Sequence, residues 1–190
     1  IQNVSIDSFY MGVYEVTSSV YEDVTNWPPE KGGLPAENIS FLDALNYCSN
    51  LNSNYPEYSF FIPSEPEWEY AAKYNIADQS ATIYPWSNEI YIFNANYGNQ
   101  NPGSIGVGAY SYPSHFGMFD MSGNVLEWTN NCFSESLKDS VVDNNEDCWV
   151  VARGGGFWHG AEGVRTTSRY HLPQDTEAAG VGLRIAMRPY

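Results

Sequence analysis

The sequence has few basic residues: 8 of its 190 residues are Lys or Arg, against 23 Asp or Glu, which gives a formal charge of −15. A nucleic-acid-binding protein needs the opposite balance, because cationic side chains must neutralise the phosphates. An anionic membrane surface is disfavoured for the same reason. No apolar run reaches the ~20 residues that a membrane span requires. The sequence therefore predicts neither a nucleic-acid partner nor membrane insertion by this domain.

Cysteine is scarce as well. The three cysteines are too few for a disulfide scaffold, and no two of them have the C-x-x-C spacing of a zinc knuckle or a thioredoxin-like dithiol. Cys132 and Cys148 bracket an acidic loop. They either close that loop as a disulfide, if the protein is exported, or are two small buried thiols. The chain opens on Ile1 rather than Met, which is typical of a processed or trimmed product.

The apolar content is enough for a core, since 43% of the residues are hydrophobic and 16% are aromatic. Three Ser-x-x-acid segments, at residues 19–22, 40–43 and 64–67, predict the starts of short helices. Residues 74–114 show no helical period and indicate a long loop region with short strands. The β-rich runs near the two ends of the chain predict strands; these are residues 9–16, 150–153 and 181–187. The pattern predicts one compact α+β unit over residues 1–190.

Several segments, in order, resemble one known family. They are GVYEVT at residues 12–17, IPSEPEWEYAA at 62–72, FGMFDMSGNVLEWT at 116–129, RGGGFW at 153–158 and GLR at 182–184. This is similar to the pattern of formylglycine-generating, sulfatase-modifying-factor domains. The resemblance implies the formylglycine-generating-enzyme type of the C-type lectin fold, loop-rich and with few short helices. A fold does not fix a function, so each site is considered separately.

Enzymes of that family oxidise a substrate cysteine with a copper-binding pair of cysteines. Aligned on the motifs above, the two cysteine positions are occupied by His159 and Val164, and no cysteine follows Cys148. Copper(I) prefers soft thiolate or thioether ligands, which an imidazole and a valine cannot replace. The resemblance therefore implies no copper and no oxidase activity of this type. The alternative is a metal-dependent oxidase or accessory enzyme that uses a different metal through His159 or His171.

The family also binds calcium in the segment that matches residues 120–127. The resemblance implies a site made by the carboxylates of Asp120 and Glu127 with the backbone carbonyls of Gly123 and Val125. Such a turn suits calcium, because Ca²⁺ takes six to eight oxygen ligands in flexible geometry. The alternative is that the two acids only hydrogen-bond the turn.

The segment 157–182 is expected to display ligand-binding side chains. It resembles the variable regions of diversity-generating retroelement proteins, which use this lectin fold to present mutable residues. Tyr and Trp offer large contact areas with few rotors, and His, Thr and Asp add adaptable hydrogen bonds. Arg165, Arg169 and Arg184 are expected to lie buried in ion pairs that hold the segment rigid. The expected ligand-binding residues are Trp158, His159, Gly160, Thr166, Thr167, Tyr170, His171, Leu172, Asp175 and Thr176.

The sequence thus predicts a non-catalytic ligand-binding display protein. Its expected partner is a protein or glycan ligand on another cell or host. Its expected location is extracellular or at the cell surface, with any signal or anchor outside this chain.

Overall fold

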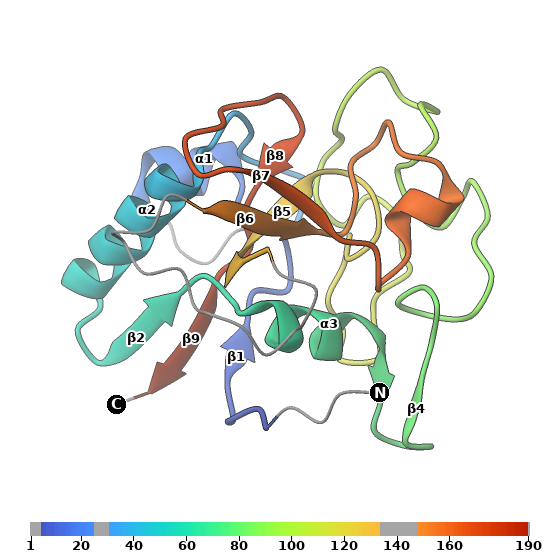
Figure 1. The fold of residues 1–190 in the computed structure, drawn as a ribbon, viewed down its shortest axis with the longest axis horizontal. Helices are drawn as coiled ribbons and strands as arrows, with labels where there is room; N and C mark the ends of the chain where they lie inside the picture. The colour runs from blue at the N-terminus through green and yellow to red at the C-terminus, as the bar shows by residue number, and fades with distance from the viewer. Residues whose placement is uncertain (1–4, 25–30, 134–147, 190) are drawn as a thin grey trace.

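The computed structural model describes residues 5–24, 31–133 and 148–189 (Figure 1). The long loop region between β4 and β5, drawn green to yellow, gathers on one side of the molecule, beside the orange segment that follows β6 (Figure 1). The elements, in chain order, are β1 (Tyr10–Met11), α1 (Ser18–Glu22), α2 (Phe41–Asn54), β2 (Tyr58–Phe61), α3 (Glu65–Lys73), β3 (Tyr74–Asn75), β4 (Ser80–Ala81), β5 (Leu126–Cys132), β6 (Trp149–Arg153), the 3-10 helix η2 (Ala161–Val164), β7 (Tyr170–Pro173), β8 (Val181–Gly182) and β9 (Ala186–Pro189).

The described residues form two larger sheets and a small third one, in which β3 pairs with β4 antiparallel. The first has the order β1-β9-β2 and is antiparallel, so the last strand lies between the first two strands of the chain. The second has the order β7-β6-β5-β8, in which β5 pairs with β6 antiparallel and with β8 parallel. The expected joining of the first and last segments by strands is therefore confirmed.

Two of the three expected helix starts are confirmed by their caps. Ser40 and Asp43 form a reciprocal capping box at the start of α2, where the Asp43 N–H donates to the Ser40 hydroxyl at 3.1 Å. Ser64 and Glu67 do the same for α3. The expected cap at Ser19 is wrong, because α1 already begins at Ser18 and has no side-chain hydrogen bond at its N-cap.

The core joins α2 to the second sheet. Trp128 on β5 is fully buried, packs edge-on against Phe41 of α2 with ring centroids 6.1 Å apart, and donates its indole N–H to the Ile39 carbonyl at 2.7 Å. Trp68 on α3 is fully buried in a second cluster with Met118 and Met121. Each tryptophan lies within a core cluster, on β5 and on α3. A large ring can be buried in this way because its indole N–H is hydrogen-bonded.

The strand predictions are only partly confirmed. The run 9–16 forms a ladder only at β1; beyond it, the chain follows the last segment through single hydrogen bonds, such as Val16 N–H to the Leu183 carbonyl at 2.9 Å. Residues 150–153 lie in β6, and the run 181–187 is split between β8 and β9. The sequence did not indicate β2, β5 and β7. None of the helices in the described ranges is long and apolar enough to cross a membrane.

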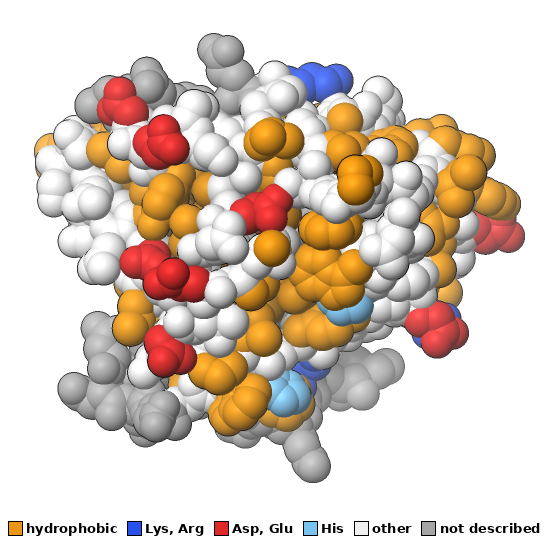
Figure 2. Space-filling view, turned by 90° about the horizontal axis from the view of Figure 1, so that it is seen from above, with side chains coloured by type: hydrophobic (Ala, Val, Ile, Leu, Met, Phe, Trp, Pro, Cys, Tyr) orange, Lys and Arg blue, Asp and Glu red, His pale blue; other side chains and the backbone are white. Residues whose placement is uncertain are grey.

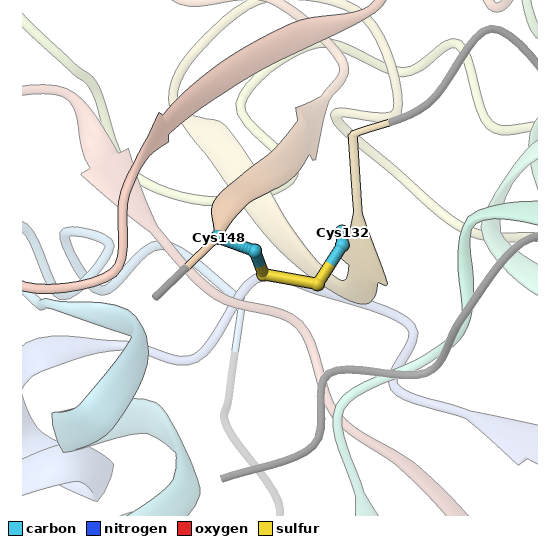
Figure 3. Close-up of a disulfide and its surroundings, with 2 residues drawn as sticks. All are labelled: Cys132 and Cys148. Atoms are coloured by element: carbon cyan, nitrogen blue, oxygen red, sulfur yellow. A yellow bond between two sulfur atoms is a disulfide. The ribbon is translucent and has the colours of Figure 1, made fainter. Parts of the chain in front are cut away.

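Cys132 and Cys148 form a disulfide, with their Cα atoms 5.7 Å apart (Figure 3). Cys132 ends β5 and Cys148 directly precedes β6, so the bond ties two adjacent strands together. Of the two possibilities that the sequence left open, the structure shows the disulfide. The acidic loop that the two cysteines bracket lies mainly at residues 134–147, outside the described residues.

Candidate ligand-binding surface

The segment 157–182 is held by buried arginine–glutamate contacts to α3. Arg153, at the end of β6, is fully buried, pairs with Glu69 and Glu65, and donates to the Ser168 carbonyl at 2.7 Å. Arg169 makes a two-point contact with the Glu65 carboxylate, at 2.5 and 2.8 Å. Such paired contacts fix orientation as well as distance. The expected structural role of Arg169 is confirmed, although its side chain is partly exposed.

Arg184 anchors the far end of the segment from inside the core. Its side chain and that of Glu127 are both fully buried, with Nη2 2.7 Å from Oε1 and Nε 3.0 Å from Oε2. Trp68 donates its indole N–H to the same carboxylate at 2.6 Å. The expectation that Arg165 is buried is wrong: it pairs with Glu162 at 3.1 Å, but the Arg165 side chain is 43% exposed and that of Glu162 is 87% exposed.

Four rings form a continuous row across this segment, which we call the ring row: Phe157, Trp158, His159 and Tyr170. Successive centroids lie 5.0, 4.9 and 4.3 Å apart, and all four side chains are half-buried. The Tyr170 hydroxyl donates to the Gly163 carbonyl at 3.0 Å, which fixes its ring on β7. The row is therefore a rigid aromatic feature rather than a set of free side chains.

His159 sits in the ring row as a neutral imidazole. Its Nδ1 accepts the Gly156 N–H at 2.9 Å, so that nitrogen carries no proton. Burial lowers the pKa of His159, which further favours the uncharged form. The residue is well placed for stacking, with its Nδ1 already used by the backbone.

Glycines make room for Trp158. A Cβ atom at Gly180 would lie 2.0 Å from the Trp158 ring, and one at Gly156 would lie 2.3 Å from it. Gly180 also has φ +74°, a conformation that side chains rarely adopt. Trp158 therefore lies closely on the backbone, and only part of its ring is available to a ligand.

A second group of rings, the edge cluster, lies where β5, β6 and β7 run side by side. It consists of Phe133, Trp149 and His171, with the His171 ring 4.1 Å from that of Phe133 and 5.4 Å from that of Trp149. Phe133 is 41% exposed and Trp149 is 55% exposed. The Arg169 guanidinium covers one face of Phe133 at 4.9 Å. The sequence analysis missed both exposed rings, although each directly adjoins a disulfide cysteine.

The other expected binding residues differ in exposure. Gly160, Thr167 and Asp175 are exposed, whereas Thr176 and Leu172 are half-buried and Leu172 packs against the core. Figure 2 shows hydrophobic side chains over much of this face, with histidines among them and more acidic than basic side chains.

Thr166 was expected among the ligand-binding residues, and this expectation is wrong. It is fully buried and donates its hydroxyl to the carbonyls of Thr82 and Ile83, at 3.1 and 3.0 Å. It joins the segment to the preceding loop region and is closed to a ligand in this arrangement. From the sequence, a threonine whose hydroxyl binds a loop carbonyl cannot be told apart from one whose hydroxyl faces solvent.

The expected calcium residues lie close together, but they are engaged in other contacts. Asp120 accepts the Gly108 N–H at 2.5 Å, and Glu127 accepts from Arg184 at 2.7 Å and from Trp68 at 2.6 Å. An ion that used Glu127 would have to displace Arg184 and Trp68. In this arrangement the Glu127 carboxylate is held by Arg184 and Trp68. Calcium binding remains a prediction from the sequence.

Close packing against the Asn96 backbone explains why a glycine stands at position 123. Gly123 has φ +83°, and a Cβ atom there would lie 2.2 Å from the Asn96 carbonyl oxygen. Within the described ranges, no three His, Cys, Asp or Glu side chains are grouped so that they could hold a metal ion.

The positions expected for the copper cysteines carry no sulfur. His159 belongs to the ring row, and Val164 is fully buried. The one free cysteine, Cys48, lies in α2, where burial raises the pKa of its thiol to about 12. A thiol held protonated in this way is a poor nucleophile and a poor metal ligand.

Comparisons with known proteins agree with this arrangement. The chain is 28% identical over 171 residues to "Inactive C-alpha-formylglycine-generating enzyme 2" of Mus musculus, covering 83% of this chain and 50% of that protein. It therefore spans about half the length of that relative.

Two solved structures share the fold. "Treponema denticola variable protein 1" superposes with a TM-score of 0.81 at 20% identity, covering 98% of this chain and 86% of that one. "Major Tropism Determinant U1 Variant" superposes with a TM-score of 0.64 at 10% identity, covering 96% of this chain and 51% of that one. They confirm the expected formylglycine-generating-enzyme type of C-type lectin fold, with its three short helices and small sheets.

The family model described as "Sulfatase-modifying factor enzyme 1-like domain" matches residues 1–189. The match takes in both sheets, the buried arginine–glutamate contacts and the whole of the segment 157–182. The chain belongs to the sulfatase-modifying factor enzyme 1-like domain family.

Proposed function

We propose that this domain is a non-catalytic display protein that binds a protein or glycan ligand through the segment 157–182 and the edge cluster. The observation that carries the proposal is the contrast between the buried residues that hold the segment and the exposed residues that the segment presents. Buried Arg153 and Arg184 fix the two ends of the segment, while exposed residues of varied size and polarity lie between them. A rigid frame lowers the entropic cost of binding, so small contacts can contribute to affinity.

The names of three relatives support the same direction, although active formylglycine-generating enzymes are also among the sequence relatives. One structural relative is called a variable protein, another a tropism determinant, and one sequence relative is called inactive. The disulfide supports a location outside the reducing cytosol, at the cell surface or beyond it. The alternative, an oxidase or accessory enzyme of the family, lacks the thiol pair that copper chemistry of this kind uses.

The proposal is tested by randomising four exposed positions, Gly160, Thr167, His171 and Asp175. A Cβ atom at Gly160 meets nothing within 4 Å, so that position also tolerates side chains. We expect most library members to change the free energy of unfolding by less than about 0.5 kcal/mol. Selection against serum albumin as a model protein should then yield binders. A matched library at buried Val164 and Thr166 should lose folding.

The proposal would be overturned by general unfolding of the surface library, or by a selection in which affinity never depends on those four positions. A second measurement addresses catalysis. The purified domain, supplied with copper and oxygen, is incubated with a cysteine-containing peptide, and aldehyde is measured by mass spectrometry. We expect no aldehyde. Turnover of the peptide would show that the domain is an enzyme and would contradict the proposed non-catalytic function.

A further inference from the structure

A second exposed aromatic group lies outside the segment 157–182. We call it the loop aromatic cluster and define it as Trp86, Tyr91, Phe93 and Tyr112. The rings of Tyr91 and Phe93 stack with centroids 5.4 Å apart, and Tyr112 lies 6.0 Å from Phe93 and 5.9 Å from Trp86. Phe93 is 56% exposed, Tyr91 51% and Tyr112 38%. Contiguous exposed rings of this kind are typical of an interaction site.

The loop that carries these rings is fixed by its own hydrogen bonds. The Trp86 indole N–H donates to the Glu89 carbonyl at 3.2 Å, and the Tyr91 N–H donates to the Asn94 side chain at 2.7 Å. The Ile83 N–H donates to the Asn88 side chain at 3.0 Å. The rings therefore keep their places without a partner, which lowers the cost of binding one.

The loop is joined directly to the proposed binding segment. Tyr84, which stacks on Trp86, donates its hydroxyl to the Ala161 carbonyl at 3.0 Å. Thr166 holds the Ile83 carbonyl from the other side. A partner large enough to cover the segment can therefore reach the loop aromatic cluster as well.

The charges of the domain indicate the chemistry of that partner. Every Lys and Arg in the described ranges already has an acidic or aromatic contact within the chain: Lys31 lies over Phe119, Lys73 pairs with Glu69, Arg153 with Glu65 and Glu69, Arg165 with Glu162, Arg169 with Glu65, Arg184 with Glu127, and Arg188 with Glu67. With 23 acidic against 8 basic residues, the surface is left with a large excess of negative charge. Glu89, beside the cluster, is itself exposed.

From these observations we infer that the loop aromatic cluster is a docking surface for a protein partner that presents arginine or lysine side chains. Ring faces attract cations, Glu89 adds a carboxylate beside them, and the net negative charge of the domain speeds the encounter with a basic surface. The binding of a basic partner would also break no salt bridge within this domain. The inference rests on the proposed function and adds the chemistry of the partner to it.

The test uses a dye-labelled hexa-arginine peptide as the probe and the matching hexa-citrulline peptide, which is uncharged, as its control. Binding is followed by fluorescence anisotropy at low and high salt. Phe93→Leu and Tyr112→Leu keep an apolar side chain and the net charge but remove an exposed ring. Tyr10→Leu removes an exposed ring of β1, which is 62% exposed, and serves as the matched control variant. Thermal melts check that all three variants fold.

We expect the arginine peptide to bind at least ten-fold more tightly than the citrulline peptide, and each cluster variant to weaken it by about two- to five-fold. Tyr10→Leu should leave its affinity unchanged. Equal binding of both peptides, or equal effects of the three variants, would overturn the inference. A glycan-array signal that Phe93→Leu abolishes, together with an arginine-peptide affinity that Phe93→Leu leaves unchanged, would also overturn the inference. None of these results touches the library at positions 160, 167, 171 and 175, so the two proposals can fail separately.

Discussion

Replacing Asp120 with Asn tests the electrostatics beneath the binding segment. Burial, with a smaller contribution from the nearby Glu127 carboxylate, raises the pKa of Asp120 from 3.8 to about 6, against the lowering effects of the Gly108 N–H and Arg184. Asp120 has φ +59°, a conformation that asparagine also tolerates. An asparagine oxygen can still accept the Gly108 N–H. The substitution thus removes the charge while keeping the local geometry.

The size and sign of the effect follow from linkage. A rise in pKa from 3.8 to about 6 corresponds to about 3 kcal/mol. Because the folded state favours the protonated acid, this stabilisation is fully present below the ordinary pKa and is lost as the pH rises through about 6. Asp120→Asn should therefore match the unsubstituted domain near pH 4 and exceed its stability by about 3 kcal/mol near pH 8.

The assay is urea unfolding of both proteins at pH 4, 6 and 8, with EDTA present. The exposed Asp175→Asn is the matched control, because it removes one carboxylate from the surface instead of from the interior. A stability difference that stays constant with pH, or an Asn variant that is less stable at pH 8, would refute the reasoning. Repeating the series with calcium tests the metal prediction: an ion held by Asp120 would stabilise the unsubstituted domain and not the variant.

The remaining predictions concern the frame and are checked by denaturant unfolding. Trp128→Ala removes a fully buried ring between sheet and helix and should cost about 3–5 kcal/mol; a near-unchanged midpoint would contradict its place in the core. Arg184→Met leaves the buried Glu127 charge uncompensated and should cost about 3–5 kcal/mol at pH 7, with Glu127→Gln in the same background recovering part of it. Replacing Cys132 and Cys148 by Ser opens a loop with a sequence separation of 16 and should cost about 3 kcal/mol; equal stability with and without reductant would argue against the bond.

Local signals in the sequence predicted the elements that depend on local chemistry. The caps at Ser40 and Ser64 are confirmed because a capping box needs only four consecutive residues. The motif resemblance predicted the fold and the role of Arg184, since ordered motifs carry information about long-range packing. The strand β5 was missed because nearly all of its residues are buried and show no alternation, and β7 was missed because it has only four residues and ends in a proline.

The binding surface was harder to predict than the frame. Thr166 and Thr167 are neighbours with the same side chain, yet the first is fully buried and the second is exposed. Phe133 and Trp149 come together with His171 only because three strands end at the same edge. Exposure at such positions depends on tertiary packing, which one sequence without its relatives does not encode in any local pattern.

The position of β9 between β1 and β2 also has a consequence for synthesis. The sheet β1-β9-β2 needs residues 186–189, so it cannot assemble until those residues have been synthesised. Contacts that span so much sequence are slow to form. Until then, β1 and β2 lack the strand that joins them into one sheet.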